Sequence, residues 1–140
     1  RGGVDSEAAI DDYVKWAVES GADEVCFKEL YVSTSEESVW YSHGANEWSA
    51  RHQVPLSLVH HWASAAGLSE LARLPWGAPI YGGSIFGRDM RFAAYTEPSL
   101  FWERRNGTAR SWNVMADGRC LASLEDRASV VGRDLPVPCP

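Results

Sequence analysis

The sequence predicts an α/β fold in which a helix–strand unit of a parallel sheet comes first and a β-meander follows. Three observations support this. Apolar residues recur at helical spacing up to Gly21, a buried strand is predicted over 24–32, and the C-terminal half carries the hairpin signals Asn106-Gly107 and Asp117-Gly118. The 140 residues amount to one domain by size and are enough to bury a core.

The first helix is predicted after Asp5 or Ser6, either of which can cap it. Its apolar residues keep i, i+3, i+4 spacing and are Ile10, Tyr13, Val14, Ala17 and Val18. Gly21 is expected to end the helix, and Glu24 to Val32 reads as a strand with the carboxylate of Glu29 at its centre. This order indicates one unit of a parallel sheet, entered partway through.

The middle of the chain begins with a polar and aromatic connection, Thr34 to Val54, of the length expected for a lid or binding loop. A second helix is predicted over Leu56 to Ala66, because Pro55 suits a first helical position and Gly67 a stop. Residues Leu68 to Leu74 are expected to add another helical turn, which Pro75-Trp76-Gly77 would break.

From Ala78 the pattern changes to short strands. Expected strand segments flank Gly82-Gly83, a turn is expected at Gly87-Arg88-Asp89, and two further strands are predicted over Met90–Thr96 and Leu100–Arg104. The three-proline tail Val130–Pro140 is expected to be extended or disordered. This organisation predicts three parts: 1–77 with the helices, 78–126 rich in strands, and 127–140 as the tail.

The composition excludes several classes of function. A net charge of −6 disfavours nucleic-acid backbones and anionic membranes, and no apolar run approaches the roughly 18 residues of a spanning helix. Three scattered cysteines do not form a disulfide framework, so a reducing, cytoplasmic location is expected. The seven tryptophans indicate either a lined pocket or an irregular core filled by large side chains.

Glu29 is the sharpest candidate for a site residue. It shares strand parity with Val25, Phe27 and Tyr31, so in a packed core its charge would need a partner. Near the carboxyl end of the strand it would instead face a ligand, because α/β folds place their sites there; Tyr31 and Ser33 are equally well placed. A structural ion pair is the alternative for Glu29.

Arg110, Trp112 and Asn113 form a second candidate group, since Arg and Asn offer fixed donor geometry to a polar or anionic substrate. The alternative is an exposed strand face. The double glycines match no phosphate-binding motif, and the adjacent His60 and His61 point about 100° apart on a helix, so no metal site is predicted.

Two segments give the chain a resemblance to radical SAM enzymes, of the type related to the molybdenum-cofactor GTP cyclase and the peptide-modifying enzymes. Residues 1–32 resemble the family stretch in which Arg-Gly-x-Asn-Asp precedes a helix and a strand reading Arg-Phe-Ile-Glu-Leu-Met: Phe27, Glu29 and Leu30 match, and Val4-Asp5 departs slightly. Residues 112–126, WNVMADGRCLASLED, are similar to the hairpin of the form Thr-x-Asp-Gly-x-x-x-x-Cys-Leu that follows the family's barrel.

The resemblance implies the later part of a partial (β/α) TIM-like barrel, followed by the β-meander. It implies an enzyme that reductively cleaves S-adenosylmethionine and abstracts hydrogen from a small-molecule or peptide substrate. Glu29, Tyr31 and Ser33 would contact the adenosine, with Arg110, Trp112 and Asn113 near the substrate. The family's CxxxCxxC motif for a 4Fe–4S cluster is absent from this sequence, so it and the N-terminal half of the barrel would lie upstream. The chain alone would be inactive, and it is expected to retain neither S-adenosylmethionine nor a cluster.

Two other functions stay open. One is a self-contained α+β binding module that holds a small ligand or a peptide with its Trp-rich segment Val39–Trp48. The other is a relative of the SAM enzymes without the cluster, which acts as a recognition or partner subunit. Neither involves nucleic acid or a membrane.

Overall fold

The computed structural model describes residues 3–109 and 111–132. The chain divides into two compact units: the first unit contains Arg1–Tyr31 and Ser49–Glu97, and the second unit contains Val32–Trp48 and Pro98–Pro140. One boundary falls inside helix α2 (Gly44–His52), which therefore supplies residues to both units. None of the helices in the described ranges has the length and apolar character needed to cross a lipid bilayer.

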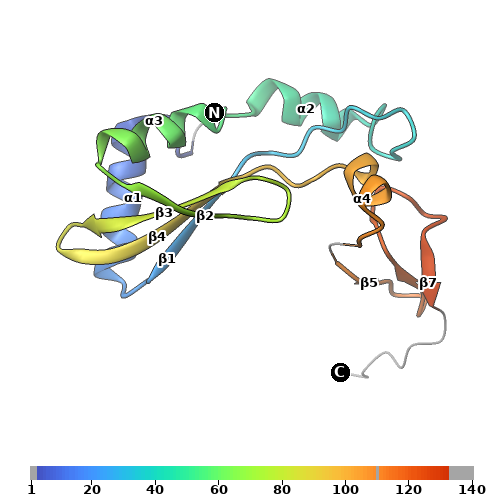
Figure 1. The fold of residues 1–140 in the computed structure, drawn as a ribbon. Helices are drawn as coiled ribbons and strands as arrows, with labels where there is room; N and C mark the ends of the chain where they lie inside the picture. The colour runs from blue at the N-terminus through green and yellow to red at the C-terminus, as the bar shows by residue number, and fades with distance from the viewer. Residues whose placement is uncertain (1–2, 110, 133–140) are drawn as a thin grey trace. The chain divides into compact units, whose positions relative to one another are not determined.

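The first unit is a mixed four-stranded sheet with helices on one face (Figure 1). Its strands are β1 (Glu24–Lys28), β2 (Ser69–Arg73), β3 (Pro79–Ile85) and β4 (Arg88–Tyr95), in the order β1-β4-β3-β2. Only β1 and β4 are parallel, whereas β4 with β3 and β3 with β2 are antiparallel.

The predicted (β/α) barrel is therefore wrong: the described chain forms a small mixed α+β structure, and β1 lies at one edge of an open sheet. The physical reason is the length of the connections. A parallel neighbour needs a crossover of about a dozen residues or more, but the turns at Trp76-Gly77 and Phe86-Gly87 are short and reverse the chain. A single crossover, from β1 through the helices to the β2–β4 hairpins, leaves one parallel pair.

Helices α1 and α3 begin close to where the sequence predicts. Helix α1 (Glu7–Glu19) is capped by Ser6, whose side-chain oxygen accepts a hydrogen bond from the Ala9 N–H at 3.2 Å. Helix α3 (Ser57–Ala65) follows Pro55. Residues 68–74 are not helical as predicted but form β2, because their backbone groups pair with β3 instead of with one another.

An aromatic core joins α1 and α3 to the sheet. The Trp62 ring packs edge-on against Phe27 of β1 and Phe92 of β4, with ring centroids 6.1 and 5.2 Å apart. Its indole N–H donates to the Asp11 carboxylate at 2.7 Å and so ties α3 to α1. Phe92 is completely buried, and Trp62 is 3% exposed. This group fixes β1, whose last residues lead into the candidate site.

The double glycine of β3 serves packing. A Cβ at Gly82 would meet the Leu71 side chain at 2.4 Å, and a Cβ at Gly83 would meet Leu68 at 3.0 Å. Two leucines, one directly before β2 and one on it, therefore occupy the space that these glycines leave.

The second unit combines helix α4 (Leu100–Asn106) with a three-stranded antiparallel sheet of β5 (Asn113–Val114), β6 (Cys120–Leu121) and β7 (Val130–Gly132). The hairpin predicted at Asp117-Gly118 joins β5 to β6. The strand predicted over Leu100–Arg104 is wrong: Ser99 caps a helix there by accepting from the Trp102 N–H at 3.3 Å. Gly107, at φ 60°, ends that helix, so Asn106-Gly107 is a helix terminus and not a hairpin. Most of the tail 130–140 lies outside the described residues.

The turn between β3 and β4 generates a stability prediction. Phe86 and Gly87 occupy its two central positions with φ of 50° and 78°, the backbone of a type I′ turn. A left-handed conformation costs a bulky L-residue about 1–2 kcal/mol, and asparagine tolerates it better. Since Phe86 is half exposed, Phe86→Asn is expected to raise the free energy of unfolding by about 1 kcal/mol, measured by urea denaturation.

Gly87→Ala is the matched control in the same turn and is expected to lower the stability, because alanine at φ 78° is strained. A loss of stability in Phe86→Asn would show that Phe86 contributes more by packing than it costs in backbone strain.

Candidate functional site

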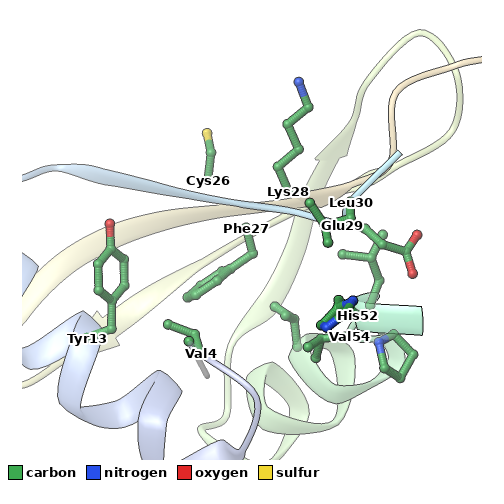
Figure 2. A pocket seen from close by; sticks show the side chains of 13 residues that line it. Val4, Tyr13, Cys26, Phe27, Lys28, Glu29, Leu30, His52 and Val54 are labelled. Carbon is green, nitrogen blue, oxygen red and sulfur yellow. The ribbon is translucent and has the colours of Figure 1, made fainter. Parts of the chain in front are cut away.

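A cavity of about 500 Å³ lies beneath the C-terminal half of β1, within the first unit; we call it the β1 pocket (Figure 2). Its walls are mainly apolar side chains from β1, α1, α3 and the segments beside them. These are Val4, Tyr13, Phe27, Leu30, Val54, Pro55, Leu56 and Val59. Cys26 and Lys28 of β1 also border it, and Glu29, after the strand, and His52, at the end of α2, are further polar residues of its lining.

The alternation of β1 decides which of its side chains reach the pocket. Val25 and Phe27 are buried against the helices, whereas Glu24, Cys26 and Lys28 are exposed. Figure 2 shows Phe27 on the same side of the strand as Val4 and Val54, with Cys26 and Lys28 pointing away from them. Lys28 forms an ion pair with Glu97.

Glu29 follows the last residue of β1, so its backbone is still held by the sheet. Its N–H donates to the Tyr95 carbonyl at 3.1 Å. The Thr96 hydroxyl donates to its carboxylate at 2.5 Å, and this is the one hydrogen bond to that carboxylate among the described residues. The side chain is half-buried, and its remaining lone pairs are available to a ligand. The ion pair that the alternative interpretation required is not found in the described ranges.

The segment after α2 closes the far side of the pocket. Gln53 donates from its side-chain amide to the Leu30 carbonyl at 2.9 Å, which fixes the end of α2 against the residues that follow β1. This bond places His52 and Val54 at the pocket. The sequence did not predict either residue as part of a site. Residues 34–54 were predicted to form one long loop, and no local pattern connected His52 or Val54 to β1. The helical run Gly44–His52 is the signal that could have shown where His52 lies.

The three predicted SAM-contacting residues are divided between the two units. Glu29 lines the β1 pocket; Tyr31 is half-buried two residues beyond it and does not line the pocket. Ser33 belongs to the second unit, where its backbone bonds to the Asn46 side chain at 2.7 and 3.0 Å. The Ser33 hydroxyl donates to Glu125 at 3.4 Å, so this serine is part of a buried polar group.

The predicted substrate residues are also in the second unit. Arg110 lies outside the described residues. Trp112 is 74% exposed, and the Asn113 amide donates to the Leu121 carbonyl at 3.2 Å, which stabilises the β5–β6 hairpin. Of this group, Trp112 is the described residue that presents its side chain to solvent.

No metal site emerges from the described residues, in which no group of three or more His, Cys, Asp and Glu side chains could hold an ion. Of the adjacent histidines, His60 shares a hydrogen bond with the Tyr81 hydroxyl, 2.9 Å from its Nδ1, and so links α3 to β3. Burial raises the pKa of Tyr81, and nearby Glu70 adds to this, which keeps its hydroxyl protonated.

Comparison with known proteins adds no relative: no protein-family model, curated protein or solved structure matches this chain.

The second unit contains a charged network around Arg104, which bonds to Glu37 and to Asp126. Asp126 also accepts from the Ala128 N–H at 2.8 Å. That backbone bond, and secondarily Arg104, lowers the pKa of Asp126 below its ordinary value. The folded state therefore favours the carboxylate, and the resulting stabilisation is present above the unfolded pKa and lost as the pH falls below it.

We expect Asp126→Asn to lower the stability of the chain at pH 7 and to weaken its loss of stability in acid. Urea denaturation between pH 7 and pH 3 measures both effects. Arg127→Gln, an exposed neighbour in the same turn, is the control and should keep the wild-type pH profile. If Asp126→Asn shows the same acid dependence as the wild type, the network does not contribute to acid sensitivity.

Proposed function

We propose that the first unit binds S-adenosylmethionine in the β1 pocket, as the SAM-binding part of a radical SAM enzyme. The observation that carries the proposal is the position of Glu29. Its carboxylate stands at the carboxyl end of a strand and at the polar end of a mainly apolar cavity of about 500 Å³. This site belongs to an α+β structure, and the proposal does not require a closed barrel.

The size and chemistry of the pocket suit an adenosine. Small-molecule sites span about 300–1,000 Å³ and combine apolar walls with a few placed polar groups. The rings of Tyr13 and Phe27 and the aliphatic side chains of Val54 and Val59 offer apolar contact to a purine. The Glu29 carboxylate can accept hydrogen bonds from ribose hydroxyls or from the ammonium of the methionyl group.

The described residues do not fit a 4Fe–4S cluster. The free thiols among them are Cys26 in the first unit and the buried Cys120 in the second, and no cluster-binding group is present. We therefore assign this chain no step that involves the cluster. Its proposed contribution is to bind and orient the nucleoside and to exclude water from it with the apolar walls.

The first test is Glu29→Gln. The substitution keeps the side-chain size and an oxygen that accepts from Thr96, but it removes the charge that strengthens bonds to ribose or ammonium. A charge-assisted hydrogen bond contributes about 1.5–3 kcal/mol, so the Kd for S-adenosylmethionine should rise about tenfold or more. Isothermal titration calorimetry measures the Kd.

Glu70→Gln, an exposed glutamate on β2 outside the pocket, is the matched control and should leave the affinity unchanged. Tyr31→Ala and Ser33→Ala then show whether the other two predicted residues contribute. Absence of binding to the wild-type chain, or equal affinities of the wild type and Glu29→Gln, would contradict the proposal.

A binding module remains the second candidate, and the second unit contains the observation that favours it. Four large side chains of its first segment are 41–51% exposed: Val39, Trp40, Tyr41 and Trp48. The Trp40 ring stands edge-on to His43, with 5.3 Å between centroids. Exposed aromatic side chains close in sequence are typical of surfaces that hold peptides or flat ligands.

This alternative predicts that Trp40→Ala and Trp48→Ala abolish binding to peptides selected on the wild-type chain. Trp16→Ala is the control, since Trp16 is 59% exposed but belongs to the first unit. Fluorescence titration with the selected peptides measures the effect, and equal losses in all three variants would indicate unspecific adsorption to aromatic surface.

A further inference from the structure

Strand β1 has an unpaired edge within the described part of the chain. It is the terminal strand of the sheet, and β4 occupies its other side (Figure 1). The Asp23 carbonyl accepts from the Arg91 N–H at 3.1 Å, and the Glu29 N–H donates to the Tyr95 carbonyl at 3.1 Å. Because a parallel ladder alternates, the peptide groups of Glu24, Cys26 and Lys28 point to the open edge.

The sequence of β1 is complementary to itself in antiparallel register. Consider two copies of β1 paired antiparallel around a two-fold axis at Cys26. Glu24 of each copy then lies opposite Lys28 of the other, at both ends of the strand. Val25 then lies opposite Phe27, on the face that packs against the helices. Opposite charges and apolar pairs across strands each stabilise an antiparallel pair.

The surface beside this edge is apolar. Tyr13 is 41% exposed and Trp16 is 59% exposed, with 5.6 Å between their ring centroids. The Tyr13 ring also contacts Phe27 of β1, 6.1 Å away, so the aromatic pair of α1 continues onto the edge strand. An added strand with apolar side chains on this face would cover both rings.

The edge lacks two of the common protections of an open strand, proline and a bulge. Proteins commonly block open strands with proline, a bulge or charges that repel a second strand. The segment 24–28 contains no proline and pairs with β4 without a bulge. Glu24 and Lys28 repel only where like charges face each other and attract in the two-fold register above, so the charges favour that register of two copies.

We infer that this chain forms a symmetric dimer in which the β1 strands of two copies pair antiparallel about Cys26 and join the two sheets into one. The interface is isologous, as in most small homodimers, and each copy supplies the same strand and the same aromatic pair. The inference does not require a ligand in the β1 pocket, although Tyr13 and Phe27 line that pocket and also lie beside this edge.

Charge reversal tests the register. In Glu24→Lys, both ends of the strand pair would carry two facing lysines, and in Lys28→Glu two facing glutamates. With about 0.2–1 kcal/mol per cross-strand pair and two pairs per dimer, each single variant should weaken dimerisation roughly tenfold. Sedimentation equilibrium measures the dissociation constant.

The double variant Glu24→Lys with Lys28→Glu restores complementary charges across the interface and should recover most of the lost affinity. The double variant cannot restore the ion pairs within one copy, in which Glu24 pairs with Arg91 at 3.2 Å and Lys28 pairs with Glu97. In the double variant both of these ion pairs become like-charge contacts. Recovery therefore reports contacts between copies and not the stability of one copy.

Oxidative trapping tests the same register without any substitution at the charges. Directly opposed residues in a hydrogen-bonded antiparallel pair lie about 5.5 Å apart at Cα, within the range that a disulfide spans. Diamide takes up the two protons and two electrons that the two Cys26 thiols release. Mass spectrometry should then find a Cys26–Cys26 peptide, and Cys26→Ser should give none.

Three outcomes would overturn the inference: a wild-type chain that is monomeric at every concentration, a double variant no better than the single ones, or a covalent dimer linked through other cysteines only. Circular dichroism checks that each variant is folded. If a charge variant fails to fold, the trapping experiment on the wild type still decides.

Discussion

The structure of the first unit depends on the parallel pairing of β1 with β4. These strands are far apart in sequence, and the register that places Val25 beside Phe92 and Phe27 beside Ala94 creates the surface on which both helices pack. Trp62 of α3 then packs against Phe27 of β1 and Phe92 of β4, so its position depends on both strands of the pair. The same pairing leads directly into Glu29, whose backbone and carboxylate are held by Tyr95 and Thr96 at the end of β4. The core and the β1 pocket are therefore consequences of one strand register.

The two units differ in how they are stabilised. The first buries aliphatic and aromatic side chains between a sheet and its helices. The second has a short apolar centre at Cys120 and Leu121 and buries several polar side chains, which are Ser33, Ser38, Glu103, Ser123 and Glu125. Buried polar groups are tolerated where each finds a hydrogen-bond partner, so specific bonds, such as that from Ser33 to Glu125, determine the geometry of this unit. Substitution of one of these residues is therefore expected to destabilise the fold of the second unit, whether or not the residue also belongs to a site.

Sequence reasoning succeeded where the signal was local. The cap at Ser6, the apolar spacing of α1 and the stop at Gly21 lie within one segment, and the same is true of α3 after Pro55. It failed where distant partners decide: the residues of β2 are all exposed and become a strand because β3 pairs with them. The segment 100–104 was predicted to be a strand because Asn106-Gly107 follows it as a hairpin signal, yet the Ser99 cap and Gly107 make it helical. Glu29 could be found from its place on a strand, whereas His52 and Val54 reach the pocket through the Gln53 bond to Leu30, which no local pattern reveals.

The way the chain passes between its two units has a consequence for biosynthesis. The first unit is complete at Glu97, so it can fold while the rest of the chain is still being translated. The second unit cannot, because its early segment, 32–48, bonds to residues near the C-terminus. The Ser33 hydroxyl donates to the Glu125 carboxylate, and the Val39 N–H donates to the Glu125 carbonyl. Until those residues emerge from the ribosome, the segment that carries the exposed Trp40, Tyr41 and Trp48 remains unfolded. Such a segment is a natural site for a chaperone to engage during synthesis.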